Sequence, residues 1–289
     1  MQKVLDLIIE KIIFICAIAS IIFVILIFSF LFKEGLSFFK NYEVSKFIGG
    51  HFWYPSSDPA SFGILSLIVG SVLVTLGACA IAVPIGIMTA LFISEIVPKG
   101  ARDVLKSLVE LMAAIPSVVI GFVGMITLVP LVKSIFSLPT GLTAFSGSIM
   151  LAFMAIPTIV TISEDAIRSV PRHYKQGALA LGATKWQTLR RIVLKAAMPG
   201  IIAAVMLGIS RVIGETMAVM MITGNAAHIP HSIFEPVRTM TATIAAEMGE
   251  TVRSGMHYKS LFAIGLVLFL ITFLINFIAD LFLGKNKNT

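Results

Sequence analysis

Six long apolar runs, separated by shorter polar segments, dominate the pattern of this sequence. Each run is long enough for an α-helix to cross a hydrocarbon core of about 30 Å, which takes about 20 residues. Most of the runs lack the strict alternation of an outer-membrane barrel, so the pattern predicts an all-α polytopic membrane protein. The runs cover residues 12–32, 64–93, 104–132, 142–163, 197–222 and 260–283.

Prolines inside these runs are expected to shape the helices. Pro84, Pro116 and Pro157 lie within the second, third and fourth runs. Proline removes a backbone hydrogen bond and bends a helix axis, so we expect three bent but continuous spans.

The composition excludes a soluble domain. Hydrophobic residues make up 57% of the 289 residues and charged residues only 13%, and the mean hydropathy is +0.99. The first run continues without a small-residue cleavage site, so we expect a retained helix and not a signal peptide.

The net charge of +7 reports orientation and does not point to nucleic acid. With the N-terminus inside, inside segments hold 14 Lys and Arg residues and outside segments hold 7, and Arg211 is the one remaining basic residue, placed in the membrane. Because basic residues concentrate on the cytoplasmic side of membranes, this bias predicts an N-in, C-in topology.

The fifth run carries two charges in its interior. Arg211 and Glu215 are four residues apart, so on a continuous helix they share one face and are expected to pair. Two interpretations are open, a site on an ion pathway and a structural ion pair that joins two helices. We favour the pathway, because the inner end of this run continues directly from the cytoplasmic segment described next.

That cytoplasmic segment, residues 164–196, is less apolar but keeps helical spacing. Pro171 begins a first predicted helix, Gly182 suits a turn, and Thr184 can cap a second short helix. A helix-turn-helix bearing Trp186 and flanked by basic residues has the shape to enter a groove of another protein.

The outer segments leave further alternatives open. The aromatic cluster at residues 51–54 is either a headgroup anchor or a docking surface. The threonines at 239, 241 and 243 precede a helix whose N-terminus could offer free amides to an anion, although ordinary surface residues are the favoured interpretation. The histidines and cysteines lack metal-ligand spacing, so we expect solvated loop histidines and packing cysteines; they are His228, His231, His257, Cys16 and Cys79.

The cytoplasmic segment resembles the loop of ABC-importer permeases, whose pattern is Glu-Ala-Ala, three residues, Gly, nine residues and Ile-x-Leu-Pro. Gly182 matches the glycine, and Ile192 and Leu194 follow at the right spacing. The departures are Gln176, Gly177 and Lys195, which replace Glu, Ala and Pro. In that family the loop docks in a groove of the ATPase subunit, and the resemblance implies docking through Ala178, Gly182, Ala183, Thr184 and Trp186.

The stretch ISRVIGETMAVMMITGN is similar to the fifth helix of phosphate-specific transport (Pst) permeases, where Arg-x-x-Gly-Glu-Thr recurs. The Met-Ala-Val continuation looks more like the PstC subunit than PstA, and the resemblance extends from about Phe62 to Leu283. It implies a substrate path at Arg211, Glu215 and Thr216. Arginine suits such a path because its guanidinium stays charged and offers a planar fork to paired oxygens.

The resemblance implies a type I ABC-importer permease fold in the prokaryotic plasma membrane. The implied partners are a second, PstA-like permease, two copies of a PstB-like ATPase, an external PstS-like phosphate-binding protein and membrane lipid. The chain has no G-x-x-x-x-G-K-[ST] motif, so we expect no cofactor in this chain, with ATP and Mg bound by the partner ATPase, and no enzymatic activity of its own. The predicted divisions are residues 1–63 (first helix and outer loop), 64–283 (permease domain) and 284–289 (cytoplasmic tail).

Three alternative functions are open. A permease for molybdate, sulfate or phosphonate would share this architecture. An ion-coupled secondary carrier predicts inverted repeats and further intramembrane acids, and an intramembrane enzyme needs a nucleophile and base within the spans. The sequence displays neither set of features.

Overall fold

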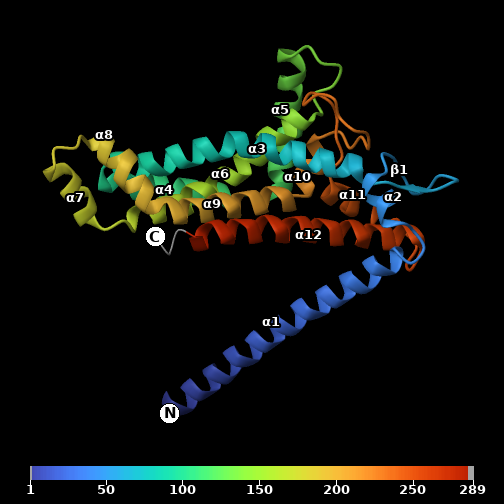
Figure 1. The fold of residues 1–289 in the computed structure, drawn as a ribbon, viewed down its shortest axis with the longest axis horizontal. Helices are drawn as coiled ribbons and strands as arrows, with labels where there is room; N and C mark the ends of the chain where they lie inside the picture. Colours follow the sequence, from blue (N-terminus) through green and yellow to red (C-terminus); the bar gives the residue numbers. More distant parts are fainter. Residues whose placement is uncertain (1, 286–289) are drawn as a thin grey trace.

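The computed structural model describes residues 2–285, and most of them are helical (Figure 1). Residues 286–289 of the predicted tail lie outside the described residues. The helices, in chain order, are α1 (Gln2–Phe38), α2 (Val44–Gly49), α3 (Leu65–Leu91), α4 (Lys99–Ala113), α5 (Ser117–Ile135), α6 (Ala144–Arg168), α7 (Arg172–Ala180), α8 (Lys185–Thr188), α9 (Leu194–Gly214), α10 (Met217–Ile222), α11 (Met240–Glu247) and α12 (Met256–Lys285). Two π-helical turns, η1 (Phe92–Ile96) and η2 (Leu189–Val193), extend α3 and join α8 to α9.

Six helical segments within residues 2–285 are long and apolar enough to span a membrane, which confirms the predicted number. They are Ile9–Phe38, Leu65–Ile96, Ser117–Ile135, Ala144–Arg168, Lys185–Gly214 and Met256–Ile278. In Figure 1, α12 ends on the side of the bundle that carries α7 and α8, and α1, although it splays away from the bundle, also begins toward that side. This arrangement agrees with the N-in, C-in topology, with the α7–α8 loop in the cytoplasm.

The third predicted span is wrong as a continuous helix. The run 104–132 is divided between α4 and α5, and Pro116 has an extended backbone (ψ 138°) between them. A residue before proline is disfavoured in the α-helical region, which ends α4, while Pro116 is well placed to precede the first turn of α5. Only α5 is a candidate span, because α4 is short and carries charges along its length.

The core lies along α6, which packs most extensively against α3 and α9. In its most apolar window, 61% of the α6 residues are buried, against none for α1. Ile159 of α6 is 1% exposed and belongs to the main apolar cluster with α3 and α9 residues. Helix α1 diverges from the bundle: it packs mainly against α12, and Phe38 at its outer end also contacts Phe47 of α2 and Phe62 (Figure 1). Most of its apolar surface is therefore left for lipid or a neighbouring protein.

The outer end contains a small hairpin. Strand β1 (Trp53–Tyr54) pairs antiparallel with β2 (Ser61–Phe62), with Trp53 opposite Phe62. Trp53 is 2% exposed in an apolar cluster with residues of α1, α3 and α12, so it is neither a headgroup anchor nor a docking residue. The other members of the aromatic cluster, His51, Phe52 and Tyr54, remain exposed.

Candidate translocation and coupling site

One long helical segment connects the cytoplasmic loop to the charged positions. From Lys185 the chain continues through α8, η2 and α9 to Gly214, which gives 30 residues of helix. The fifth run is therefore not a single helix to residue 222, because α9 ends at Gly214 and α10 begins at Met217. Arg211 lies in the last turn of α9, where a cation interacts favourably with the carbonyl end of the helix.

Arg211 contacts α6 through its side chain. Its Nη1 donates a hydrogen bond to Oγ1 of Thr158 over 3.1 Å. Thr158 is the fifteenth residue of the 25-residue α6, about 21 Å from the outer end at 1.5 Å per residue. The guanidinium therefore lies near the middle of the membrane span of α6, and it is only half-buried.

The predicted pairing of Arg211 with Glu215 is wrong. Glu215 has an extended backbone (ψ 133°), and its Oε1 accepts hydrogen bonds from the amides of Thr216 (3.1 Å) and Ala218 (3.3 Å). Glu215 thus caps α10 because Gly214 ends the preceding helix, and the four-residue spacing no longer places the two charges on one face. Thr216 is likewise engaged locally, since its hydroxyl donates to the Gly214 carbonyl over 3.1 Å.

The threonines of the outer segment pack against this helix break. Thr239, Thr241 and Thr243 are 5%, 8% and 0% exposed, so they are not the ordinary surface residues that the sequence favoured. The Thr241 hydroxyl donates to the Glu215 carbonyl over 2.8 Å, and Thr239 caps α11 by accepting from the Ala242 amide. The Ala242 amide, which the anion-binding alternative would leave free at this helix start, is therefore bound by the protein itself.

The predicted cytoplasmic turn is confirmed in its geometry. Gly182 has φ +85° and donates its amide to the Leu179 carbonyl, and the Ala183 amide donates to the Ala178 carbonyl over 3.1 Å. These two bonds form a Schellman motif, which closes a helix with glycine in the left-handed region. The turn predicted at Gly182 and Ala183 is therefore correct, and Ala178 of α7 supplies the carbonyl that closes it.

The start of α8 is fixed by a capping box, as predicted for Thr184. Its hydroxyl accepts from the Gln187 amide (3.2 Å), and the Gln187 side chain accepts from the Thr184 amide (2.9 Å). The turn presents Leu181 and Trp186 outward, at 91% and 65% exposed. Two large apolar side chains at an exposed tip are suited to a protein groove.

The base of this loop is anchored to the bundle. Leu189 and Val193 of η2 are buried in a cluster with residues of α3, α6 and α9 that includes Ile167 and Ile201. A displacement of the loop therefore acts on packed helices and not on a free linker. Of the positions where the sequence departs from the ABC loop pattern, Lys195 is exposed on α9, while Gln176 lines a cavity beside α7.

An ion-pair cluster between α4 and α6 was missed from the sequence. Glu164 is 1% exposed, and its carboxylate contacts Lys106 Nζ at 2.9 Å and Arg168 Nη1 at 3.5 Å. The hydrogen bond to Asp165, with a further contribution from Glu164, raises the pKa of Lys106 above its ordinary value of 10.5. The Glu164 and Arg168 spacing of four residues was a signal for part of this cluster, but nothing local pointed to Lys106.

A second cluster, at the outer end, was also missed. Glu247 of α11 accepts from Trp53 Nε1 (3.0 Å) and Arg238 Nη1 (2.9 Å), and it contacts His257 Nε2 at 2.8 Å. His257 is 25% exposed and bound to Glu247, so it is not the solvated loop histidine that was expected. The cluster joins the β1–β2 hairpin to α11 and to the first turn of α12.

Comparisons with known proteins agree with this architecture. Residues 82–286 match the family model described as "Binding-protein-dependent transport system inner membrane component". A probable ABC transporter permease protein, YqgH of Bacillus subtilis, is 40% identical over 261 residues, covering 90% of this chain and 84% of the relative. The phosphate transport system permease protein PstC of Mesorhizobium japonicum is 37% identical over 252 residues, covering 81% of this chain and 76% of the relative.

A solved structure shows the same fold at low sequence identity. A bacterial alginate ABC transporter, in complex with an alginate pentasaccharide-bound periplasmic protein, has a chain that superposes with a TM-score of 0.64 at 16% identity, covering 93% of each chain. The fold is therefore that of a type I ABC-importer permease, a multi-pass protein of the prokaryotic plasma membrane. The chain belongs to the binding-protein-dependent transport system inner membrane components, and among them to the PstC-type permeases.

Proposed function

We propose that this chain is a permease subunit of an ATP-driven importer for inorganic phosphate and forms half of the translocation path. The observation that carries the proposal is the half-buried guanidinium of Arg211, near the middle of the α6 span, in a PstC-type chain. The phosphate transport named for the PstC relatives supports the same cargo.

Arg211 has the chemistry that a desolvated oxyanion requires. A guanidinium remains charged at any working pH and presents several donors in a planar fork. In the structure one of its nitrogens is held by Thr158, a neutral hydroxyl, so phosphate oxygens compete with a weak partner and not with a carboxylate. Glu215 contributes by capping α10 and fixing the helix break beside Arg211, and Thr216 stays a candidate contact at the same break.

The partners follow from the cytoplasmic loop and the family. A PstB-like ATPase, present in two copies, would receive the Leu181 and Trp186 tip in its groove and bind the ATP and Mg, so that the permease itself needs no cofactor and catalyses no reaction. Ala178, Gly182, Ala183 and Thr184 would hold that tip in its docking geometry. A PstA-like permease would supply the other half of the path, and a PstS-like protein would deliver phosphate from outside.

ATP closure of the ATPase dimer would move the loop, and the continuous helix from Lys185 to Gly214 would carry that movement to Arg211. The anchored base at η2 supports this mechanical link, because the buried cluster there joins the loop to α3 and α6 as well. The residues at the α9–α10 break would then change their position relative to Thr158.

Anion competition tests the cargo. The importer is assembled in proteoliposomes with both permeases, the ATPase and the binding protein. It is expected to take up radiolabelled phosphate only when ATP is present on the side of the membrane that carries the ATPase. Excess unlabelled phosphate should reduce the uptake of labelled phosphate by competition, whereas excess sulfate, molybdate or phosphonate should leave that uptake unchanged. If one of these other anions reduced the uptake as much as phosphate does, that oxyanion would replace phosphate as the proposed cargo.

A further inference from the structure

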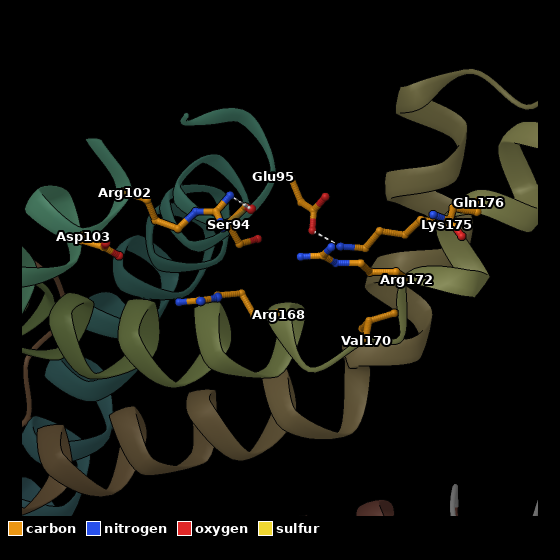
Figure 2. Close-up of a pocket in the computed structure, with 9 residues that line it drawn as sticks. All are labelled: Ser94, Glu95, Arg102, Asp103, Arg168, Val170, Arg172, Lys175 and Gln176. Carbon is orange, nitrogen blue, oxygen red and sulfur yellow. Dashed lines mark hydrogen bonds and ion pairs between the residues drawn. The ribbon is translucent and has the colours of Figure 1, made fainter. Parts of the chain in front are cut away.

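A polar cavity lies at the cytoplasmic end of the molecule, away from Arg211. It has a volume of about 700 Å³ and opens between η1, α4, the inner end of α6 and the first turns of α7 (Figure 2). Four cationic side chains line it, from three helices: Arg102, Arg168, Arg172 and Lys175. Figure 2 shows Arg172 and Lys175 entering from α7 and Arg102 facing them from the opposite wall.

The lining has an excess of positive charge. Glu95 and Asp103 are the two acidic residues in it, so the four cations leave a net charge of +2. Glu95 is bound to Lys175, and Arg102 is engaged mainly with backbone carbonyls at the end of η1, including that of Ile93 at 2.9 Å. Within residues 2–285, Arg172 makes no side-chain hydrogen bond or ion pair that would neutralise it, and Arg168 has only the 3.5 Å contact with Glu164.

A buried hydroxyl in the same wall lacks a partner. Ser94 is 4% exposed, and its Oγ has no hydrogen-bond partner among the described residues. In Figure 2 Ser94 lies in the wall of the cavity, between Arg102 and Glu95. Buried hydroxyls are nearly always satisfied, so an unpaired donor in the wall of a cationic cavity is consistent with an acceptor bound beside it.

The start of α7 adds to this preference for an anion. Pro171 precedes the helix and supplies no side-chain cap, so the first amides of α7 are not bound by a capping side chain. Amides at a helix N-terminus favour negative charge. Cations, an unpaired hydroxyl and a helix start thus converge on one cavity from several elements.

From these observations we infer that the cavity between η1, α4, α6 and α7 binds a phosphate group. A phosphate group carries one negative charge as a diester and about 1.5 to 2 as a free phosphate or monoester at neutral pH, and its several acceptor oxygens suit the positive lining and its separated donors. A group bound there would contact Arg172 of α7 together with Arg102 of α4 and Ser94 of η1, and so would tie the cytoplasmic loop to the bundle. This site does not depend on which anion the importer carries.

Two sources supply this chemistry, free inorganic phosphate in the cytoplasm and the headgroup of an anionic phospholipid in the inner leaflet. Hydrogen–deuterium exchange of the α7 amides in the complete, nucleotide-free importer separates them. One arm titrates inorganic phosphate into phosphatidylcholine nanodiscs at constant ionic strength, and the other adds phosphatidylglycerol to phosphate-free nanodiscs. Slower α7 exchange in the first arm identifies free phosphate, and slower exchange in the second identifies the lipid.

Variants connect the response to the cavity. Arg172→Gln should raise the phosphate concentration or lipid fraction for half-maximal protection by about tenfold, the equivalent of one strong contact. Ser94→Ala should raise it by a smaller factor without affecting folding, because the hydroxyl has no partner to lose. Arg191→Gln removes the same charge from an exposed position on η2 outside the cavity and should leave the response unchanged, as should Arg211→Gln.

The inference is overturned if α7 exchange responds in neither arm. It is equally overturned if Arg172→Gln and Arg191→Gln shift the response alike, or if Arg211→Gln abolishes it, because the effect would then come from general charge or from the translocation path. None of these results bears on phosphate as the cargo, which the uptake competition tests separately.

Discussion

The turn at Gly182 offers a sharp test of the cytoplasmic loop as an ATPase-docking element. Gly182 has φ +85°, and a Cβ built there would meet no atom within 4 Å. The change Gly182→Ala therefore introduces backbone strain alone, without a steric clash. Since the left-handed region costs a residue with a Cβ about 1–2 kcal/mol, the alanine variant should loosen the turn by about that amount.

This cost should appear in docking. If the ATPase groove requires the turn as observed, a penalty of about 1–2 kcal/mol weakens ATPase binding by roughly 5- to 30-fold. The global fold should be unaffected, because the turn is exposed and its base is anchored separately by Leu189 and Val193. Binding of the purified ATPase to the permease pair in nanodiscs measures the effect directly.

Gly177 provides the matched control. It lies inside α7, and a Cβ there would also meet nothing within 4 Å, but its backbone is helical. Gly177→Ala should stabilise α7 by about 0.5–1 kcal/mol and leave ATPase binding equal or tighter. If Gly182→Ala binds the ATPase as tightly as the unchanged protein, or if both variants weaken binding equally, the assignment of the turn as the docking element is wrong.

Three further perturbations test the packing and the ion pairs. Gly208→Ala would place a Cβ 2.7 Å from Ile159 Cγ1, so it should lower the free energy of unfolding by about 1–3 kcal/mol in a detergent titration. Combining it with Ile159→Ala should cost less than the sum of the two single changes, and simple additivity would refute the contact. Trp53→Phe removes a donor from Glu247 and should cost about 1.5–3 kcal/mol in the same titration, whereas no loss would mean that the remaining Glu247 partners compensate fully. Because the folded-state pKa of Lys106 is raised, its stabilising contribution is complete below pH 10.5 and is lost as the pH rises through the raised value. Above pH 10.5, the unfolding temperature of the unchanged protein should therefore fall more steeply with pH than that of Lys106→Met. Equal slopes of unfolding temperature against pH would contradict the ion pair.

The sequence predicted the features that rest on local signals. Six apolar runs identified the six spans, and the positive-inside bias identified the orientation. The turn at Gly182 and the cap of α8 by Thr184 were predicted correctly. A glycine after a helix and an N-cap threonine both act through hydrogen bonds within a few residues, so the local sequence is enough to identify them.

The prediction failed at the charged pair because a short break changed the geometry. Gly214 followed by Glu215 and Thr216 is itself a stop signal followed by a capping residue, but the apolar run continued past it and suggested one helix. With Glu215 bound to the α10 amides, Arg211 contacts Thr158 of α6 instead. A partner 53 positions away in the sequence cannot be deduced from helical spacing.

The outer segments were misjudged for a different reason. Trp53, Glu247 and His257 come from three separate stretches of the chain and meet only because the hairpin, α11 and the start of α12 pack together. Each of these residues lies in a stretch whose composition is typical of an exposed loop. Their burial follows from tertiary contacts, for which an isolated stretch carries no signal.

The central claim is that Arg211 lies on the path of the anion, and phosphate uptake by Arg211→Gln tests it most directly. Glutamine retains a hydrogen-bond donor for Thr158 but removes the charge, and Thr158→Val serves as the control that removes the protein contact alone. Assembly with the ATPase is measured on the same preparations. The account predicts that Arg211→Gln abolishes ATP-driven phosphate uptake in a fully assembled importer, while Thr158→Val retains it. Near-normal uptake by assembled Arg211→Gln would contradict the account and make Arg211 a structural contact between α9 and α6.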